Sequence, residues 1–240
     1  MTIYAVGDIH GQIDMLHATM SLIETDGGAD AEIVFLGDYT DRGPDSRAVI
    51  DLLIAGRDAS KPWTFIKGNH DRMFEWFMQD YPKLDAYLPV ELNWLNPRLG
   101  GDTTLASYGV DVTPKTRMIT VHQDAIAAVP ASHVGFLKSL DLSYQTDHLF
   151  FTHAGIKPDV ALNDQDEEDL LWIRQEFHDH PSLHPKLVVH GHTPIDTATH
   201  YTNRINLDTG AGYGKALTAA VFEGTKAWVL TPDGRKPLTP

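Results

Sequence analysis

The chain has 240 residues, 42% of them hydrophobic, which is enough for one sizeable domain with a buried core. It contains no cysteine, so disulfides and thiolate-ligated zinc are excluded, and any metal must be held by oxygen and imidazole ligands. A formal charge of -14 repels phosphate backbones, and we therefore expect no nucleic-acid partner.

The first predicted element is an apolar strand over residues 3–6, followed at once by the segment GDIHG at residues 7–11. This start leaves no room for a signal peptide, and no apolar run reaches bilayer length, so we expect a cytoplasmic protein with no membrane partner. Asp8 and His10 lie two residues apart and can point the same way in an extended segment. A turn with a capping aspartate is the other interpretation of this motif.

The second unit is an apolar strand over residues 33–36, the loop GDYTDRG at residues 37–43 and a helix from residue 46 to residue 54. The loop opens at the carboxyl end of a strand, where α/β sheets place their ligands. A carboxylate such as Asp38 can bridge two metal ions, and Arg42 beside it can hold phosphate oxygens. We expect the rest of the site to be arranged around Asp38.

The third unit is a strand over residues 63–66, the segment KGNHDR at residues 67–72 and a helix through residue 77. Asn69 offers a neutral carbonyl oxygen to a metal, and His70 can exchange a proton near neutral pH. A helix start capped by Asp71 is the alternative.

Residues 80–120 include Pro82, Pro89 and Pro97, a Gly-Gly pair and several aromatic residues, and we expect short helices and loops without sheet. This cap-like insertion either shapes substrate access or only covers the sheet. A helix over residues 126–140, interrupted at Pro130, is predicted after it.

The second half of the chain is richer in strands, which we place at residues 148–152, 186–189 and 204–207, with a hairpin over residues 216–230. The acidic run 164–169 suits a helix start. The prediction is an α/β protein of one domain, residues 1–240, in which two mixed sheets pack together and helices cover their outer faces.

Several strands of the second half also end in residues with ligand chemistry. His153 and His192 follow two of the strands, and Arg174 follows an apolar trio, from which we expect it to point inward. Strand alternation turns His190 away if His192 points into the site. We leave Asp208 outside the site, with a supporting contact to a histidine ligand as the alternative.

Five strands thus end in glycine-framed loops that hold metal-competent groups. Carboxylate, amide and imidazole donors without cysteine suit manganese, iron or zinc. Two such ions that share a carboxylate form a clamp for in-line displacement at phosphorus.

The segments GDIHG, GDYTDRG and GNHD, in this order, resemble the signature of the PPP-type serine/threonine protein phosphatases. The later segments THAG and GHT fit the wider superfamily of calcineurin-like metallophosphoesterases. The motifs span residues 7–193, and the chain is most similar to the short bacterial members. The resemblance implies the metallophosphoesterase fold, an αββα sandwich.

The resemblance also implies two divalent metal ions, manganese first, with iron or zinc as alternatives. Their ligands would be Asp8 and His10 for the first ion, Asp38 as the bridge, and Asn69, His153 and His192 for the second ion. A water that bridges the ions would attack phosphorus directly.

Four further residues take catalytic roles by the same resemblance. Arg42 would hold phosphoryl oxygens, with Arg174 as a second phosphate-binding arginine. His70 would protonate the leaving alkoxide and would be oriented by Asp41.

The expected activity is that of a metal-dependent phosphatase acting on phosphoserine and phosphothreonine in a protein or peptide. A symmetrical dinucleoside tetraphosphate hydrolase is the main alternative, although such enzymes commonly lack an aspartate at the position of Asp41. A calcineurin-like nuclease or cyclic-nucleotide phosphodiesterase typically has a second histidine where this chain has Pro194. An inactive phosphatase fold that serves as a binding module is the alternative from another class.

Overall fold

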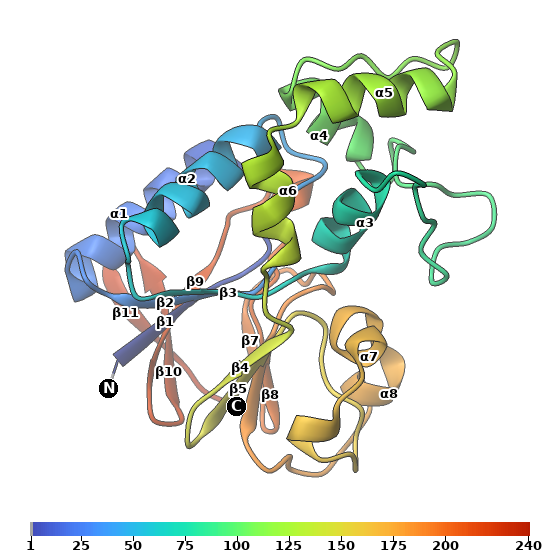
Figure 1. Ribbon diagram of the computed structural model, residues 1–240. Coiled ribbons are helices and arrows are strands. Elements are labelled where there is room, and N and C mark those ends of the chain that lie inside the picture. Colours follow the sequence, from blue (N-terminus) through green and yellow to red (C-terminus); the bar gives the residue numbers. More distant parts are fainter. Residues whose placement is uncertain (1) are drawn as a thin grey trace.

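The computed structural model describes residues 2–240, and its strands form two separate sheets (Figure 1). The six-stranded sheet has the order β11-β10-β9-β1-β2-β3 and consists of β1 (Thr2–Val6), β2 (Glu32–Phe35), β3 (Trp63–Phe65), β9 (Ala219–Glu223), β10 (Lys226–Thr231) and β11 (Gly234–Leu238). The five-stranded sheet has the order β4-β5-β6-β8-β7 and consists of β4 (Ser143–Gln145), β5 (Leu149–Thr152), β6 (Leu187–His190), β7 (Thr199–Tyr201) and β8 (Arg204–Asn206).

The helices cover the outer faces of the sheets, with α1 and α2 on one side in Figure 1 and α7 and α8 on the other. The α-helices are α1 (Ile13–Gly27), α2 (Ser46–Asp58), α3 (Asn69–Phe77), α4 (Gly101–Ser107), α5 (Met118–Ala128), α6 (Ala131–Lys138), α7 (Glu167–Trp172) and α8 (Gln175–His178). Two short 3₁₀ helices are η1 (Leu162–Asp164) and η2 (Ala211–Tyr213). The predicted α/β class, with two mixed sheets flanked by helices, is confirmed.

The core between the sheets follows from strand alternation. Ile3 and Ala5 of β1 face the second sheet, whereas Tyr4 and Val6 face the helices. Phe151 of β5 belongs to the same inner cluster as Ile3, so the two sheets share one apolar layer. This packing brings the ends of the two sheets together.

The direction of the strands places the loops of the site. Strands β1, β2 and β3 run parallel to one another, and so do β5, β6 and β8. The carboxyl ends of parallel strands meet at one edge of a sheet, and the loops with the predicted ligands all leave from such ends.

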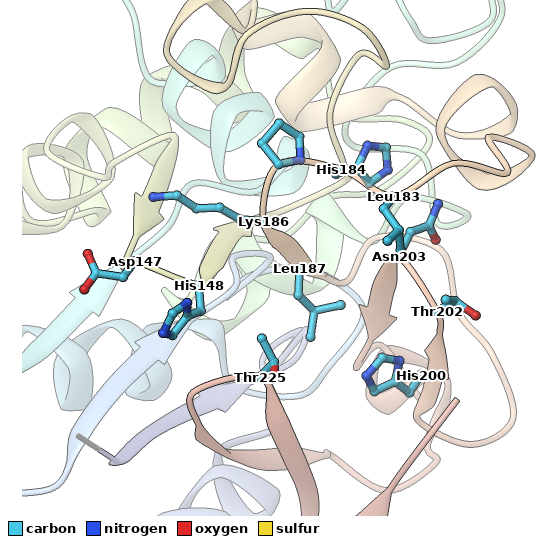
Figure 2. A pocket seen from close by; sticks show the side chains of 11 residues that line it. Asp147, His148, Leu183, His184, Lys186, Leu187, His200, Thr202, Asn203 and Thr225 are labelled. Atoms are coloured by element: carbon cyan, nitrogen blue, oxygen red, sulfur yellow. The ribbon is translucent and has the colours of Figure 1, made fainter.

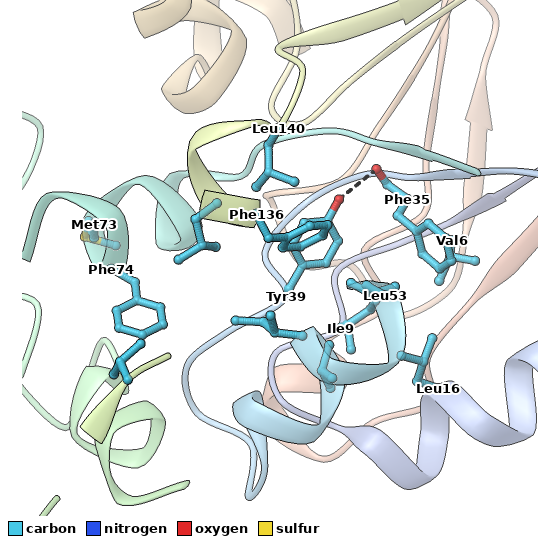
Figure 3. Close-up of a cluster of buried hydrophobic side chains, with 14 of the residues drawn as sticks. Val6, Ile9, Leu16, Phe35, Tyr39, Leu53, Met73, Phe74, Phe136 and Leu140 are labelled. Carbon is cyan, nitrogen blue, oxygen red and sulfur yellow. Dashed lines mark hydrogen bonds between the residues drawn. The ribbon is translucent and has the colours of Figure 1, made fainter. Parts of the chain in front are cut away.

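Tyr39 ties the loop after β2 to the core, as Figure 3 shows. Its ring is fully buried and lies 6.1 Å from the ring of Phe136, measured between centroids. Its hydroxyl donates to the carbonyl of Ile66 at 2.6 Å and lies 3.3 Å from that of Phe35. The side chain between Asp38 and Thr40 is therefore an anchor, and it points away from the site.

The helix predicted over residues 126–140 is wrong in its bounds. The first part begins earlier, at Met118, and the chain breaks at Pro130 as expected before α6 resumes at Ala131. The hairpin of β9 and β10 is confirmed, but β11 extends it by a third strand. The strands β4 and β7 were not predicted, because their three-residue segments, SYQ and THY, are mainly polar and do not form an apolar run.

The segment 80–120 contains α4 and the start of α5, and its loop from residue 79 to residue 92 is tied to α7 by a buried arginine. Arg72, which is 1% exposed, donates to Asp85 at 2.8 Å and to Glu168 at 2.9 Å. Its guanidinium also lies 4.6 Å from the ring centre of Trp76.

No helix within residues 2–240 combines the length and the hydropathy that a bilayer crossing requires.

Replacing Arg72 with methionine should lower the free energy of unfolding by about 3–5 kcal/mol, because the buried carboxylate of Asp85 loses its cation. Urea denaturation followed by circular dichroism measures this change. The control is Arg47→Met, which removes an ion pair with Asp51 at the surface and should cost less than about 1 kcal/mol. Equal midpoints for the two variants would contradict a structural role for Arg72.

Candidate metal centre

Asp38 lies at the centre of a buried group of donor atoms. Its Oδ2 is 3.5 Å from Nε2 of His10, and its Oδ1 is 3.5 Å from Nε2 of His153. The two oxygens of one carboxylate therefore face two different imidazoles. This is the arrangement that a carboxylate bridging two metal positions requires.

The second metal position is marked by three acceptors that face one another. Oδ1 of Asn69 lies 2.9 Å from Nε2 of His153 and 2.9 Å from Nδ1 of His192. Nδ1 of His153 donates to the carbonyl of Leu36 at 2.9 Å, so Nε2 carries the lone pair. Lone pairs directed at one point repel each other unless a cation lies between them.

The first position is formed by Asp8 and His10. Nδ1 of His10 donates to the carbonyl of Thr40 at 2.7 Å, so the lone pair of the ring lies on Nε2, which faces Asp38 and Arg42. Burial and the nearby charges of Asp208 and Asp38 raise the pKa of Asp8 well above its usual range. A divalent cation would relieve this repulsion between buried carboxylates.

The histidines of the group are neutral at pH 7. Burial lowers the pKa of His10, His153 and His192 below the usual value, so each ring keeps a lone pair. Neutral imidazoles, carboxylates and the amide oxygen of Asn69 fit a pair of divalent ions such as manganese, iron or zinc.

Backbone strain is concentrated at this group. The described chain has seven non-glycine residues with positive φ, and five of them belong to the predicted site: His10, Asp38, Asp41, Arg42 and His192. Such conformations cost about 1–3 kcal/mol each and persist only where the surroundings enforce them. The fold therefore maintains strain in order to aim these side chains inward.

Two glycines allow the loops to approach closely. A Cβ on Gly191 would lie 1.9 Å from Oδ1 of Asp8, and a Cβ on Gly68 would lie 2.1 Å from Oδ1 of Asp38. Both distances are too short for any side chain. The glycines that frame the predicted motifs are thus required by the carboxylates beside them.

Asp71 holds the loop that carries Asp38, a role the sequence did not predict. Its carboxylate accepts the backbone N–H groups of Asp38, Tyr39 and Gly68 at 2.8–2.9 Å. Gly68 is the N-cap of helix α3 and Asp71 stands at N3, where its carboxylate accepts the Gly68 N–H, so the alternative of a helix start capped by Asp71 is correct in the contact and wrong in the position. The three-residue spacing of a capping box is a signal for the contact with Gly68, but not for the contacts with Asp38 and Tyr39.

The predicted pair of Asp41 and His70 lies together: Nδ1 of His70 donates to Oδ2 of Asp41 at 2.6 Å. Asp41 is fully buried and also accepts from Trp94 at 2.8 Å and from Thr104 at 2.6 Å. Both of these donors come from the segment 80–120. The insertion therefore supports the pair from behind as well as covering the fold.

Both predicted arginines line the same pocket, of about 180 Å³, as the donor atoms. The guanidinium of Arg42 contacts Nε2 of His10 at 2.5 Å and Nε2 of His70 at 3.0 Å. Arg174 is exposed at the rim of the pocket and lines it together with His192. Together they place positive charge on the open side of an acidic site.

Among the other residues that line this pocket are Trp172, Asp208 and Tyr213, which sequence reasoning did not assign to it. Asp208 is buried and raises the pKa of Asp8, and its Oδ1 accepts the backbone N–H of Gly210 at 2.9 Å. His190 points away from the site, as alternation predicts, and packs 5.1 Å from the ring of Phe177.

A separate hollow of about 360 Å³ lies near the amino ends of β5 and β6 and is drawn in Figure 2. His148, Lys186 and His200 line it, but no group of metal-competent side chains converges there within residues 2–240. The described chain has its convergent donor groups around Asp38 alone.

Replacing Asp71 with alanine should weaken manganese binding about 10–100-fold, because the three N–H groups that fix the Asp38 loop lose their acceptor. Isothermal titration calorimetry measures this affinity. Asp166→Ala is the matched control, since Asp166 accepts a backbone N–H at the start of α7 and lies outside the donor group. Unchanged affinity in Asp71→Ala would refute this positioning role.

Comparison with known proteins agrees with this site. The family model described as calcineurin-like phosphoesterase matches residues 1–216. An asymmetrical bis(5'-nucleosyl)-tetraphosphatase PrpE of Anoxybacillus flavithermus is 27% identical, with 89% of this chain and 87% of the relative covered. Serine/threonine-protein phosphatase 2 of Escherichia coli is 38% identical over 72 residues, which is 30% of each chain.

One solved structure, provisionally described as a diadenosine tetraphosphatase, covers 95% of this chain and 92% of its own. Its TM-score is 0.63 at 21% identity, so this similarity concerns the fold alone. The family match covers the five-stranded sheet, β1 to β3 of the six-stranded sheet and every residue of the donor group. The chain belongs to the calcineurin-like phosphoesterase family.

Proposed function

We propose that the protein is a two-metal hydrolase that cleaves dinucleoside tetraphosphates. The observation that carries this proposal is the similarity to tetraphosphatases over about nine-tenths of both chains, 89% and 87%. The named serine/threonine phosphatase relative covers 30% of the chain. This contrast favours the alternative considered above over the protein phosphatase that was expected first.

The chemistry of the site suits a phosphoric anhydride. Two divalent ions in the donor group would supply an activated water and would neutralise charge on the reacting phosphate. Arg42 lies beside the ligand His10, where its two N–H groups can hold phosphoryl oxygens. Arg174 at the rim can hold a phosphate further along the chain of the substrate.

The position of cleavage is part of the proposal. The relatives are named as asymmetrical enzymes, whereas the alternative considered from the sequence was symmetrical. We therefore assign water addition and anhydride cleavage to a terminal linkage. The products would be one nucleoside triphosphate and one nucleoside monophosphate.

A protein phosphatase is the second candidate, and the Asp41–His70 pair favours it. The contact of 2.6 Å orients His70 so that its Nε2 faces the pocket, where it can donate a proton. An alkoxide leaving group needs that proton, whereas a departing phosphate is already a stable anion. A phosphorylated protein or peptide thus remains the second proposed substrate, and we propose a cytoplasmic enzyme without nucleic-acid or membrane partners.

A substrate panel should separate the two candidates. With manganese, we expect diadenosine tetraphosphate to turn over at least tenfold more efficiently than a phosphoserine peptide, with ATP and AMP as products. Chromatography of the products measures kcat/KM and the position of cleavage together. Turnover of the peptide alone would support the protein phosphatase, and ADP as sole product would indicate symmetrical cleavage.

Replacing His70 with asparagine should lower kcat about 10²–10⁴-fold on esters with poor leaving groups, because the proton donor is lost. The same variant should lose less on diadenosine tetraphosphate. Steady-state rates on phenyl phosphate, 4-nitrophenyl phosphate and the dinucleotide test this order, and metal analysis shows whether the ions are retained. His148→Asn, which alters an exposed histidine, is the control. Equal losses on all three substrates would exclude the general-acid role.

A further inference from the structure

Exposed aromatic side chains lie at both ends of the donor group. Tyr213 is 63% exposed and Tyr87 is 53% exposed, although large aromatic rings usually bury most of their surface. Tyr213 lines the pocket together with His10, whereas Tyr87 stacks on Trp172, which lines the same pocket and contacts His192. His10 and His192 are the predicted ligands of two different ions, so an exposed tyrosine lies on the side of each predicted ion.

Tyr213 marks the end of the site at His10. It closes the short helix η2, between Gly210 and Gly214 with φ of 84° and 80°. The backbone there is so close to His10 that a Cβ on Gly212 would lie 2.6 Å from the imidazole. The guanidinium of Arg42 lies 4.9 Å from the centre of the Tyr213 ring, which places a cation and an aromatic ring together.

Tyr87 marks the end at His192. Its ring stacks on Trp172 with 5.6 Å between centroids and 9° between planes. Trp172 in turn meets the His192 ring edge-on at 5.8 Å. Asp85 fixes this stack, because it accepts the indole N–H of Trp172 at 3.3 Å and the backbone N–H of Tyr87 at 3.1 Å. Arg174 lines the same pocket as Trp172, so this end also has a cation near an aromatic ring.

We propose that Tyr213 and Tyr87 are nucleobase platforms, one for each nucleoside of a dinucleoside polyphosphate whose phosphates lie between them. This inference rests on the proposed function and names the residues that recognise its substrate. Base stacking on an aromatic ring tolerates every base, so the platforms would bind the dinucleotide class and would not select adenine. Each tyrosine has an arginine at the same end of the site that can hold a phosphate. This arrangement fits a ligand whose phosphates lie between two bases.

The test measures binding of a methylene-bridged, non-hydrolysable diadenosine tetraphosphate to the manganese-loaded protein. Inorganic tripolyphosphate is the comparison ligand, because it carries the charge without the bases. We expect Tyr213→Ala and Tyr87→Ala each to weaken binding of the analogue about tenfold, and the double variant about a hundredfold. Tripolyphosphate should bind unchanged, which also shows that the variants are folded and loaded.

Two kinds of control sharpen the test. Tyr213→Phe and Tyr87→Phe keep the rings and should retain wild-type affinity for the analogue. Tyr81→Ala removes a tyrosine that is 87% exposed in the same loop as Tyr87 and should have no effect.

The inference is overturned if either alanine variant binds the analogue as tightly as the wild type does. It is also overturned if tripolyphosphate binding weakens equally, since Tyr213 would then only position Arg42, or if the wild type binds the analogue no more tightly than tripolyphosphate. Loss of analogue binding in the alanine variants without any turnover of diadenosine tetraphosphate by the wild type would support the platforms and reject the proposed hydrolase.

Discussion

The burial of the Asp38 carboxylate between two imidazoles is the constraint on which the rest of the site depends. Asp38 occupies the left-handed backbone region, and the carboxylate of Asp71 holds its N–H group at 2.8 Å. A buried charge in a strained loop is unfavourable unless other groups compensate it. Part of this compensation comes from each of three kinds of residue: the neutral histidines, the glycines, which have no side chain, and the positively charged arginines.

The same constraint explains why distant segments cooperate. Asp41 is fixed by Trp94 and Thr104, which lie in the segment between α3 and α5. Arg72 lies in helix α3, which also carries Asn69 and His70. It binds Asp85 and Glu168 and so joins the loop 79–92 to α7. The insertion is therefore part of the framework that orients His70 and the rim of the pocket. It also carries one of the two exposed aromatic rings beside the pocket.

Substrate preference is separable from the metal chemistry. The donor group suits any phosphoric ester or anhydride, because each presents phosphoryl oxygens to the ions and to Arg42. Substrates differ in the leaving group and in the part of the molecule beyond the leaving group. The Asp41–His70 pair is suited to act on the leaving group. The arginine and aromatic pairs at the two ends are suited to bind the part of the substrate beyond it.

Local pattern was sufficient to predict where the ligand-bearing loops begin. Apolar runs such as residues 33–36 indicate buried strands, and the glycines after them indicate turns. Both can be predicted from the sequence because both signals depend on neighbouring residues alone. The α/β class and the two sheets followed from the same signals. The strands β4 (Ser143–Gln145) and β7 (Thr199–Tyr201) escaped, because neither segment is an apolar run.

Contacts across the fold could not be read in the same way. Nothing near Asp71 in the chain shows that it binds the N–H of Asp38, 33 residues away, and nothing near Trp94 shows that it binds Asp41. Arg174 likewise follows an apolar trio yet ends at the exposed rim. Amino-acid order specifies which chemical groups are available and at which strand ends they stand. Which of them meet, and which face solvent, depends on how the two sheets pack, since packing energy belongs to residue pairs that are remote in the sequence.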